Sequence, residues 1–222
     1  MLNLSRRDIL LTNDQINKLN KAKVAIFGLG GVGGYTLEAL VRMGINSFII
    51  VDGDTYEESN LNRQLLSTTK TIGLYKTDVW ESHIKEINPD AKVVSYNIFY
   101  DENSNIGLSD VSIIIDAIDD VKAKVLLIKK AKELNIPIIS MMGAGNRLYS
   151  SFMVTDIYKT SIDPLAKKMR KLLKEEGINK LTVVSSSVNP IKTDTTTIGS
   201  ISYVVASAGL KLAEGAIDIL LK

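Results

Sequence analysis

Short apolar runs alternate with stretches of helical periodicity over the first 150 residues of the chain. The apolar runs predict strands at 23–27, 47–51, 92–96, 111–115 and 137–141. The periodic stretches predict a helix that ends at Met43, one from about Gly73 to Ile87 and one from Val121 to Leu134. An uninterrupted apolar run is typical of a parallel strand buried on both faces. The alternation therefore predicts a parallel sheet with helices on both faces.

The pattern changes after residue 150. Strands are expected at 151–156 and 181–185, and a last helix at about 200–221. Asp163-Pro164 predicts the start of a helix, because Asp is a favoured N-cap and Pro fits the first helical position. Residues 186–200, rich in Ser and Thr, form the longest predicted loop, which we interpret as a mobile cover. Residues 1–22 predict a helical lead-in, and 100–110 a loop with at most a short helix.

These elements indicate an α/β fold: a Rossmann-like, doubly wound, mostly parallel sheet with C-terminal antiparallel strands and helices. The chain has 222 residues, 45% of them hydrophobic and 23% charged, which is enough for one large domain with a buried core. The net charge of +2 is too small to indicate a nucleic-acid partner by itself.

The composition excludes several kinds of chemistry. Without cysteine, the chain has no disulfide, no cysteine-based zinc site and no cysteine nucleophile. The only histidine, His83, is then a poor metal site and is interpreted as an ordinary helix residue, as is Trp80. No signal-peptide pattern and no apolar run of membrane-spanning length occur, so we expect a cytoplasmic protein without a membrane partner.

A glycine-rich turn between the first strand and its helix is the main candidate for a binding site. Gly28, Gly30 and Gly33 fit the dinucleotide fingerprint G-x-G-x-x-G, placed after a strand and before a helix. Glycine lets a ligand approach the backbone, and the N–H groups that open a helix favour an anion. The sequence predicts a phosphate-binding turn; the alternative is a turn that only packs a strand closely against a helix.

Polar side chains follow the next predicted strands at their carboxyl ends, where ligands of doubly wound sheets bind. Asp52 comes 19 residues after Gly33 and is suited to ribose hydroxyls, unless it is only a turn residue. Asp54 is either a neighbour of this site or a turn residue. Lys76 lies in the first turn of its helix, where the dipole disfavours a cation, and this broken rule suggests a functional role.

The motifs resemble those of the E1-like adenylating (ThiF-type) family. They are Gly28-x-Gly30-Gly31-x-Gly33, Asp52-x-Asp54, Asn60-Leu61-Asn62-Arg63-Gln64, Gly73 with Lys76, and Asp116-Ala117-Ile118-Asp119. Further segments resemble the tRNA threonylcarbamoyladenosine dehydratase branch, whose members use ATP to cyclise N6-threonylcarbamoyladenosine next to the anticodon. These segments are Pro137–Asn146, Asp156–Thr160, Asp163–Arg170 and Gly199–Ser202.

The resemblance implies ATP and Mg²⁺ as cofactors. Asp52 would bind the ribose, Gly31 would let the backbone come closest to phosphate, Arg63 and Lys76 would contact the phosphates, and Asp119 would hold the metal. Asn60 and Gln64 would orient nucleotide or substrate. The residues expected at the nucleotide are Gly28, Gly30, Gly31, Gly33, Asp52, Asp54, Ser59, Asn60, Arg63, Gln64, Lys76, Asp119 and Asp120.

The resemblance also implies partners and an organisation. A tRNA substrate, a homodimer and a sulfur or redox partner protein are expected. Arg6, or Arg7 if the register differs, would reach the phosphates of the partner subunit; the alternative is two solvated arginines. The chain is expected to form one domain, 1–222, with a nucleotide-binding half at 1–150 and an extension for substrate and dimer contacts at 151–222.

Other functions stay open at this point. The chain is alternatively an activator that adenylates the C-terminus of a ubiquitin-like sulfur carrier, or a non-catalytic nucleotide-binding regulatory domain. The lack of cysteine disfavours sulfur transfer, and Arg63, Lys76 and Asp119 disfavour a simple nicotinamide site. Within the helix 163–176, the side chains expected on one basic face are Lys167, Arg170, Lys171 and Lys174. This face either is solvated or meets the phosphates of tRNA.

Overall fold

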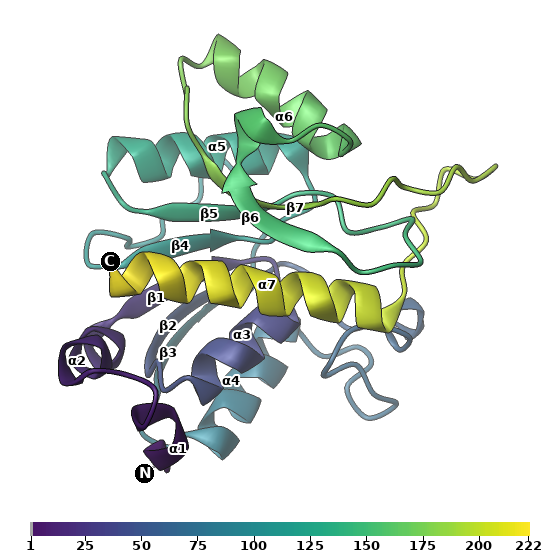
Figure 1. Ribbon diagram of the computed structural model, residues 1–222. Helices are drawn as coiled ribbons and strands as arrows, with labels where there is room; N and C mark the ends of the chain where they lie inside the picture. The colour runs from purple at the N-terminus through teal and green to yellow at the C-terminus, as the bar shows by residue number, and fades with distance from the viewer. Residues whose placement is uncertain (1) are drawn as a thin grey trace.

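The computed structural model describes residues 2–222 and is built on one seven-stranded sheet (Figure 1). The strands are β1 (Lys23–Phe27), β2 (Ser47–Val51), β3 (Lys92–Tyr96), β4 (Ile113–Asp116), β5 (Ile138–Met141), β6 (Phe152–Asp156) and β7 (Thr182–Ser186). The helices are α1 (Ser5–Asp8), α2 (Asn13–Lys21), α3 (Gly33–Arg42), α4 (Lys76–Ile87), α5 (Val121–Glu133), α6 (Pro164–Glu175) and α7 (Ser202–Leu221). Two 3-10 turns are η1 (Glu58–Asn60) and η2 (Ile157–Lys159). The expected α/β fold is confirmed.

The strand order is β3-β2-β1-β4-β5-β7-β6. All neighbours pair in parallel except β6 and β7, which are antiparallel. Of the two C-terminal strands, β7 therefore extends the parallel part, and β6 alone supplies the antiparallel edge. The chain passes from β1 outward to β2 and β3 and then returns to place β4 on the other side of β1. This reversal opens a crevice at the carboxyl ends of β1 and β4.

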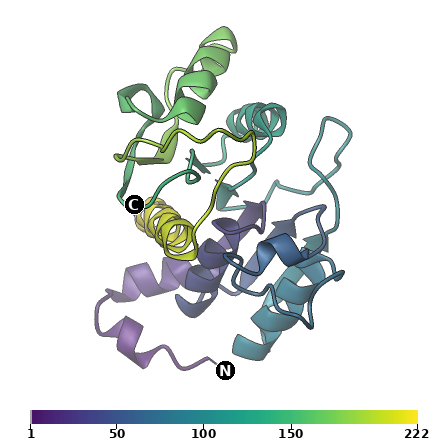
Figure 2. The ribbon, with the colours of Figure 1, turned by 90° about the vertical axis from the view of Figure 1, so that its right-hand side faces the viewer.

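Helices cover both faces of the sheet (Figures 1 and 2). One face carries α2, α3, α4 and α7, whose buried side chains share a core with the sheet. The other face carries α5 and α6. Small residues let α7 lie close to α3: a Cβ on Gly209 would be 2.5 Å from the carbonyl oxygen of Val32. In the part of the chain that is described, no helix is both long and apolar enough to cross a bilayer.

Several local signals give the structures expected of them. Thr12 closes a capping box with Gln15 at the start of α2, and Asp163 caps α6 with Pro164 in its first turn. Gly44 and Gly177 follow α3 and α6 with φ of +87° and +70°, a conformation that glycine adopts without strain.

The starts of α4 and β4 differ from the expectation. The helix expected from about Gly73 begins at Lys76, because Gly73 has φ of +84° and donates its N–H to the carbonyl of Tyr56 at 2.8 Å. The strand expected at 111–115 runs from Ile113 to Asp116, so Asp116 is the last residue of a buried strand and does not belong to the loop that follows. Residues 100–110 form a loop without a helix, in agreement with the expectation.

Candidate functional site

A cleft of about 900 Å³ lies at the carboxyl ends of the parallel strands. Its first part, the glycine half, is lined by the turn 28–32, by Asp52 and Lys76, and by Arg63 and Asp119. Its second part, the α6 half, is lined by the turn 143–147 after β5, by the start of α6, and by Pro190, Ile198 and Ser200 of the segment before α7. The motif residues that lie far apart in the sequence thus meet at one opening.

The glycines of the turn have different roles. Gly28 has φ of +89°, and a Cβ there would lie 2.6 Å from the carbonyl oxygen of Ala117. A Cβ on Gly33 would lie 1.8 Å from the carbonyl oxygen of Gly28. A Cβ on Gly31 would meet the Val205 side chain of α7 at 3.1 Å, so a larger residue here would have to displace that side chain slightly. Gly30 alone faces the cleft with room to spare, since its nearest neighbour would be Gln64 Nε2 at 3.9 Å.

Asp52 ties this turn to the end of β2. Its Oδ2 accepts the N–H of Leu29 at 2.6 Å, and its Oδ1 accepts the N–H of Asp54 at 2.8 Å. The side chain lines the cleft although only 9% of the residue is exposed. Burial raises the pKa of Asp52, and the nearby Lys76 charge and these two N–H groups oppose that rise. Asp52 therefore shapes the turn besides being available to a ligand.

Lys76 is the first residue of α4. Two carboxylates lie close enough to compensate for the unfavourable position of its charge at the start of a helix. Its Nζ lies 2.6 Å from Oδ2 of Asp54 and 4.0 Å from Oδ1 of Asp52. The lysine is 4% exposed and lines the cleft. Two carboxylates thus offset both its burial and the unfavourable helix dipole. Asp54, which the sequence allows to be either a site neighbour or a turn residue, is therefore an ion-pair partner of Lys76 within the site.

The segment 58–64 contributes Asn60, Arg63 and Gln64 to the lining of the cleft. Arg63 is half-buried, and its Nη1 donates to the carbonyl of Ser59 at 2.6 Å. Asn60 is buried and accepts the N–H of Glu57 at 3.2 Å, which fixes the turn η1. Gln64 is also buried, and its Oε1 is without a hydrogen-bond partner among residues 2–222. A buried amide oxygen with no partner is costly, so Gln64 fits a residue that meets a ligand.

The loop after β4 carries Asp119 into the cleft. Asp119 is exposed, whereas the adjacent Asp120 caps α5 by accepting the N–H of Ala123 at 2.8 Å. Beneath the loop, Lys124 is fully buried and lies 2.9 Å from Oδ2 of Asp116. Its Nζ also donates to the carbonyl of Ile118 at 3.0 Å. The buried pair holds the backbone next to Asp119, and no motif in the sequence had pointed to Lys124.

The two N-terminal arginines have different surroundings. Arg7 donates from Nη1 to the carbonyl of Met43 at 2.7 Å and pairs with Asp8, so its side chain is held at the end of α3 of the same chain. Arg6 is exposed and has no hydrogen-bond or ion-pair partner within residues 2–222. Of the two, Arg6 is the one whose side chain is available to another molecule.

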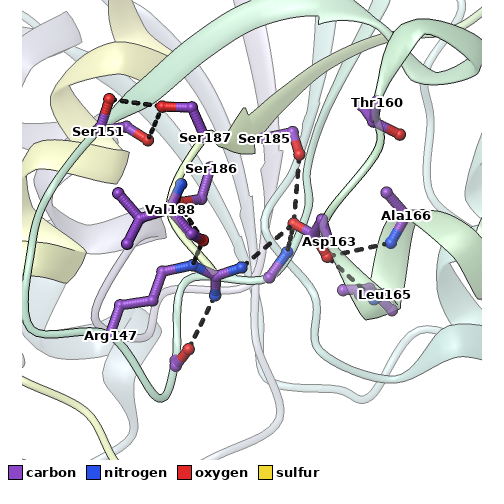
Figure 3. Close-up of polar contacts among 12 residues, drawn as sticks. Arg147, Ser151, Thr160, Asp163, Leu165, Ala166, Ser185, Ser186, Ser187 and Val188 are labelled. Carbon is purple, nitrogen blue, oxygen red and sulfur yellow. Dashed lines mark hydrogen bonds and ion pairs between the residues drawn. The ribbon is translucent and has the colours of Figure 1, made fainter. Parts of the chain in front are cut away.

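The α6 half is organised by Asp163 (Figure 3). Its Oδ1 accepts the N–H groups of Leu165 and Ala166, while its Oδ2 accepts the N–H of Gly143 at 2.9 Å and the hydroxyl of Ser185 at 3.3 Å. Asp163 thus joins the start of α6 to the ends of β5 and β7. A helix cap was expected at this position, but the links to the sheet were not.

Arg147 lies beside Asp163 and fastens the segment before α7 (Figure 3). It donates from Nε to the carbonyl of Val188 at 3.1 Å and from Nη1 to that of Gly145 at 2.8 Å. Its Nη2 is 3.9 Å from Oδ2 of Asp163 and lacks a hydrogen bond among the described atoms. Burial lowers the pKa of Arg147, and the Asp163 charge opposes this. The sequence patterns did not predict a role for this arginine, although its neighbours Gly145 and Asn146 belong to a motif.

Asn146 holds both stems of the same segment. It donates its backbone N–H to the carbonyl of Gly199 at 2.7 Å, and its Oδ1 accepts the N–H of Gly199 at 2.6 Å. Its carbonyl accepts the N–H of Ile191 at 2.6 Å. The tip between these stems is exposed and projects beyond the sheet in Figure 1. The segment 186–200 is therefore fastened at its base, and its mobility as a cover stays a prediction.

A model of the ThiF family matches residues 4–222, nearly the whole chain. The chain belongs to the ThiF family. Within this family it is similar to the tRNA threonylcarbamoyladenosine dehydratase of Bacillus subtilis (strain 168), 37% identical over 191 residues that cover 84% of this chain and 75% of the relative. It is also similar to the enzyme of that name from Escherichia coli (strain K12), 36% identical over 158 residues. That alignment covers 70% of this chain and 59% of the relative.

The chain is also similar in structure to a solved member of this family. The E. coli tRNA N6-threonylcarbamoyladenosine dehydratase in complex with ATP has a TM-score of 0.89 to this chain at 28% identity. The comparison covers 98% of this chain and 93% of that one. E. coli MccB with ATP, at 22% identity and a TM-score of 0.63, shares the fold alone. The resemblance inferred from the motifs is confirmed.

Proposed function

We propose that this ThiF-family protein uses ATP to adenylate the carboxylate of N6-threonylcarbamoyladenosine in tRNA and then cyclises the nucleoside. A carboxylate oxygen attacks the α-phosphorus of ATP, and the bond to the departing pyrophosphate breaks. An atom of the ureido group then attacks the acyl carbon, loses its proton, and expels AMP with the carboxylate oxygen. The nucleoside loses one water in total, and no protein nucleophile is required.

One observation carries the proposal: a single cleft joins the glycine half to the α6 half, in a chain whose fold matches an ATP-bound dehydratase along 98% of its length. The glycine half offers backbone N–H groups and the cations that a triphosphate needs. The α6 half offers space beside them for a second reactant. An adenylating enzyme needs both, since it must align a carboxylate with the α-phosphate.

The residues of the glycine half have separable roles in this scheme. Gly30 leaves the backbone open to phosphate, and Asp52 meets the ribose hydroxyls. Arg63 and Lys76 offset the charge that grows on the phosphates as pyrophosphate leaves. Because Lys76 is held by Asp52 and Asp54, it is already aligned before ATP binds, which avoids reorganisation during the reaction.

A magnesium ion fits the residues that are present. Among residues 2–222, no three His, Asp or Glu side chains gather as a ready-made metal site. Mg²⁺ is commonly held by one or two carboxylates together with substrate phosphates. Asp119, exposed at the cleft and without a partner in the described chain, supplies one such carboxylate. The ion would neutralise phosphate charge when bound.

The direct experiment is mass spectrometry of the nucleosides of tRNA incubated with purified protein and ATP. Conversion of threonylcarbamoyladenosine to a product lighter by one water, dependent on ATP, is expected. A lack of conversion while the protein forms an adenylate on a sulfur-carrier protein would favour the activator alternative. NAD binding in preference to ATP would favour the regulatory-domain alternative.

We also propose a homodimer in which Arg6 acts at the partner's cleft. Support comes from the free Arg6 side chain and from its neighbours Ile9 and Leu10, which are 81% and 83% exposed. In this scheme residues 1–150 hold the nucleotide, 151–222 hold substrate and contribute to assembly, and the enzyme works on tRNA in the cytoplasm. A sulfur or redox partner protein stays an expectation from the resemblance alone.

Subunit mixing tests the role of Arg6. Homodimers of Arg6→Ala and of Asp119→Ala are expected to be nearly inactive. In a hybrid dimer, one site combines an intact Asp119 with an Arg6 donated by the other chain. Random exchange makes about half of the dimers hybrid, so activity should recover to roughly a quarter of wild type. Hybrids that stay inactive would show that Arg6 does not act across the interface; recovery with Arg7→Ala instead would assign the role to Arg7.

A further inference from the structure

The exposed side of α6 is a continuous basic surface. Its side chains are Lys167, Lys168, Lys171 and Lys174. All four are exposed, and none has an ion-pair or side-chain hydrogen-bond partner within residues 2–222. The acidic residues of this helix lie at its end, where Glu176 pairs with Lys129 of α5 at 2.7 Å and Glu175 is exposed. In a chain of net charge +2, this is a local excess of positive charge.

The structure separates Arg170 from these lysines. Its Nη1 donates to the carbonyl of Thr160 at 3.0 Å, and it also contacts the Thr160 hydroxyl, so it anchors the turn η2. The sequence had assigned Arg170 to the basic face by periodicity, and that assignment is wrong because the side chain is used within the fold. Lys168 belongs to the lysine group and also lines the α6 half of the cleft.

The helix that carries the lysines is fixed in place. Asp163 joins its first turn to Gly143 and Ser185 at the ends of two strands (Figure 3). Ala166, Met169 and Leu173 are fully buried in the core on that face of the sheet. The lysines from Lys167 to Lys174 therefore extend for about 10 Å along a rigid support that begins at the cleft.

We propose that this lysine face of α6 binds the phosphate backbone of the RNA substrate, outside the cleft that holds the modified nucleoside. The inference rests on the proposed function and adds the surface that receives the rest of the RNA. A nucleoside held in the cleft belongs to a polyanion whose phosphates continue past its rim, and Lys168 stands at that rim. Unpaired lysines supply the sequence-independent part of such binding, with release of counterions.

The test compares two triple variants that each remove three positive charges. Lys167, Lys171 and Lys174 are changed to Gln in the first; Lys168 is kept because it lines the cleft. Lys21, Lys92 and Lys132 are changed to Gln in the control. The control lysines are exposed, and they lie at the amino-terminal edge of the sheet, just before β1, at the start of β3 and near the end of α5.

Binding of tRNA that carries threonylcarbamoyladenosine is measured by fluorescence anisotropy at several salt concentrations. The α6 variant should bind at least about tenfold more weakly at 0.1 M salt, and the slope of log affinity against log salt should fall by roughly 0.7 to 0.9 for each RNA phosphate that the variant no longer neutralises. Its ATP affinity and its turnover at saturating tRNA should match wild type, which also shows that it is folded. The control should bind as wild type does.

Three outcomes would overturn the inference. Unchanged affinity and slope in the α6 variant would show that its lysines do not meet RNA, even if the wild-type protein converts the nucleoside as proposed. Equal weakening in both variants would show an effect of net charge without a docking face. If the wild-type protein binds ATP but neither binds nor converts this tRNA, the proposed function itself fails, and the inference fails with it.

Discussion

The glycine half and the α6 half of the cleft differ in what fixes their shape. In the glycine half, Asp52 bonds to Leu29, 23 residues away, and Lys76 at the start of α4 bonds to Asp54, 22 residues away. In the α6 half, Arg147 reaches Val188 across 41 residues and Asn146 reaches Gly199 across 53. The first is set by backbone geometry at neighbouring strand ends. The second depends on side chains that fasten long connections, so we expect substitutions there to act on it without disturbing the first.

The largest expected effect comes from the close backbone contact in the glycine half. Gly33→Ala would place a Cβ 1.8 Å from the carbonyl oxygen of Gly28, and the backbone has to move. We expect a loss of about 4 kcal/mol or more of stability, or no folded protein, measured by denaturant unfolding. Gly30→Ala is the matched control, since it has room. It should fold normally and weaken only ATP binding; equal destabilisation by the two changes would contradict this division.

Removal of the exposed carboxylate should leave the fold intact and stop the reaction. Asp119→Ala is expected to lower turnover by roughly a hundredfold or more, because the protein loses the carboxylate that would hold Mg²⁺, and with it the positive charge that would neutralise the phosphates. The free energy of unfolding should change by less than about 0.5 kcal/mol, since Asp119 is exposed. Asp120→Ala is the comparison: it removes the cap of α5 and should cost about 1 kcal/mol of stability. A folded and fully active Asp119→Ala protein would exclude the metal role.

Lys76 should matter more for the rate than for ATP binding. Its ammonium acts on charge that grows in the transition state, so Lys76→Met is expected to reduce turnover at saturating ATP by roughly a hundredfold, with less than about tenfold loss of ATP affinity. Steady-state kinetics and equilibrium binding separate the two. A variant with normal turnover and only weakened binding would assign Lys76 to the ground state.

The same variant tests the buried charges by pH. Burial raises the pKa of Asp52 in the folded state above its ordinary value of 3.8. At a pH between 3.8 and this raised pKa, the folded protein keeps the Asp52 carboxyl protonated, whereas the unfolded chain has lost that proton. Stability therefore falls as pH rises through the raised pKa, and the cost is complete above it. Without Lys76 this pKa rises further. The variant should be less stable than wild type by about 1 to 3 kcal/mol at pH 7, with the difference shrinking in acid. Lys85→Met, which breaks an exposed pair with Glu81, should cost less than about 1 kcal/mol. A difference that does not vary with pH would contradict the coupling.

A smaller and more selective effect is expected in the α6 half. Asp163→Asn keeps the shape of the side chain but weakens its acceptance of the Gly143 N–H and the Ser185 hydroxyl. We expect the KM for tRNA to rise by roughly tenfold while the KM for ATP stays within about twofold, since the glycine half is untouched. Parallel titrations of the two substrates measure this. An equal rise in both values would mean that the two halves are not independent.

The glycine half could be predicted from the sequence because its motifs are short and stand where strands end. The alternation of strands and helices indicated the sheet, and the spacing of Gly28, Asp52 and Asp119 indicated the crevice. The exact helix start at Lys76 could not be predicted, because it depends on a backbone bond between Gly73 and Tyr56.

The contacts that organise the α6 half could not be predicted from the sequence in the same way. Arg147 sits in a stretch that looks like ordinary surface charge, as does Lys124 beneath the glycine half, and only the fold reveals that both are buried. One partner of Arg147, the carbonyl of Val188, lies on a loop whose path has no sequence signal. Periodicity assigned Arg170 to the basic face of α6 and was wrong, because the pattern of charges carries no sign of the hydrogen bond that holds its side chain to Thr160. Interactions between segments far apart in the chain leave no local pattern, so they could not be predicted.

The central claim is that the cleft activates a substrate carboxylate as an acyl adenylate. It is tested most directly with tRNA whose threonylcarbamoyl carboxylate carries the heavy isotope of oxygen, incubated with the protein and ATP. Attack on the α-phosphorus followed by ring closure transfers one carboxylate oxygen to AMP, so mass spectrometry should find the heavy oxygen in AMP and none in pyrophosphate. Heavy oxygen in inorganic phosphate, formed together with ADP, would mean activation at the γ-phosphate and would contradict the claim.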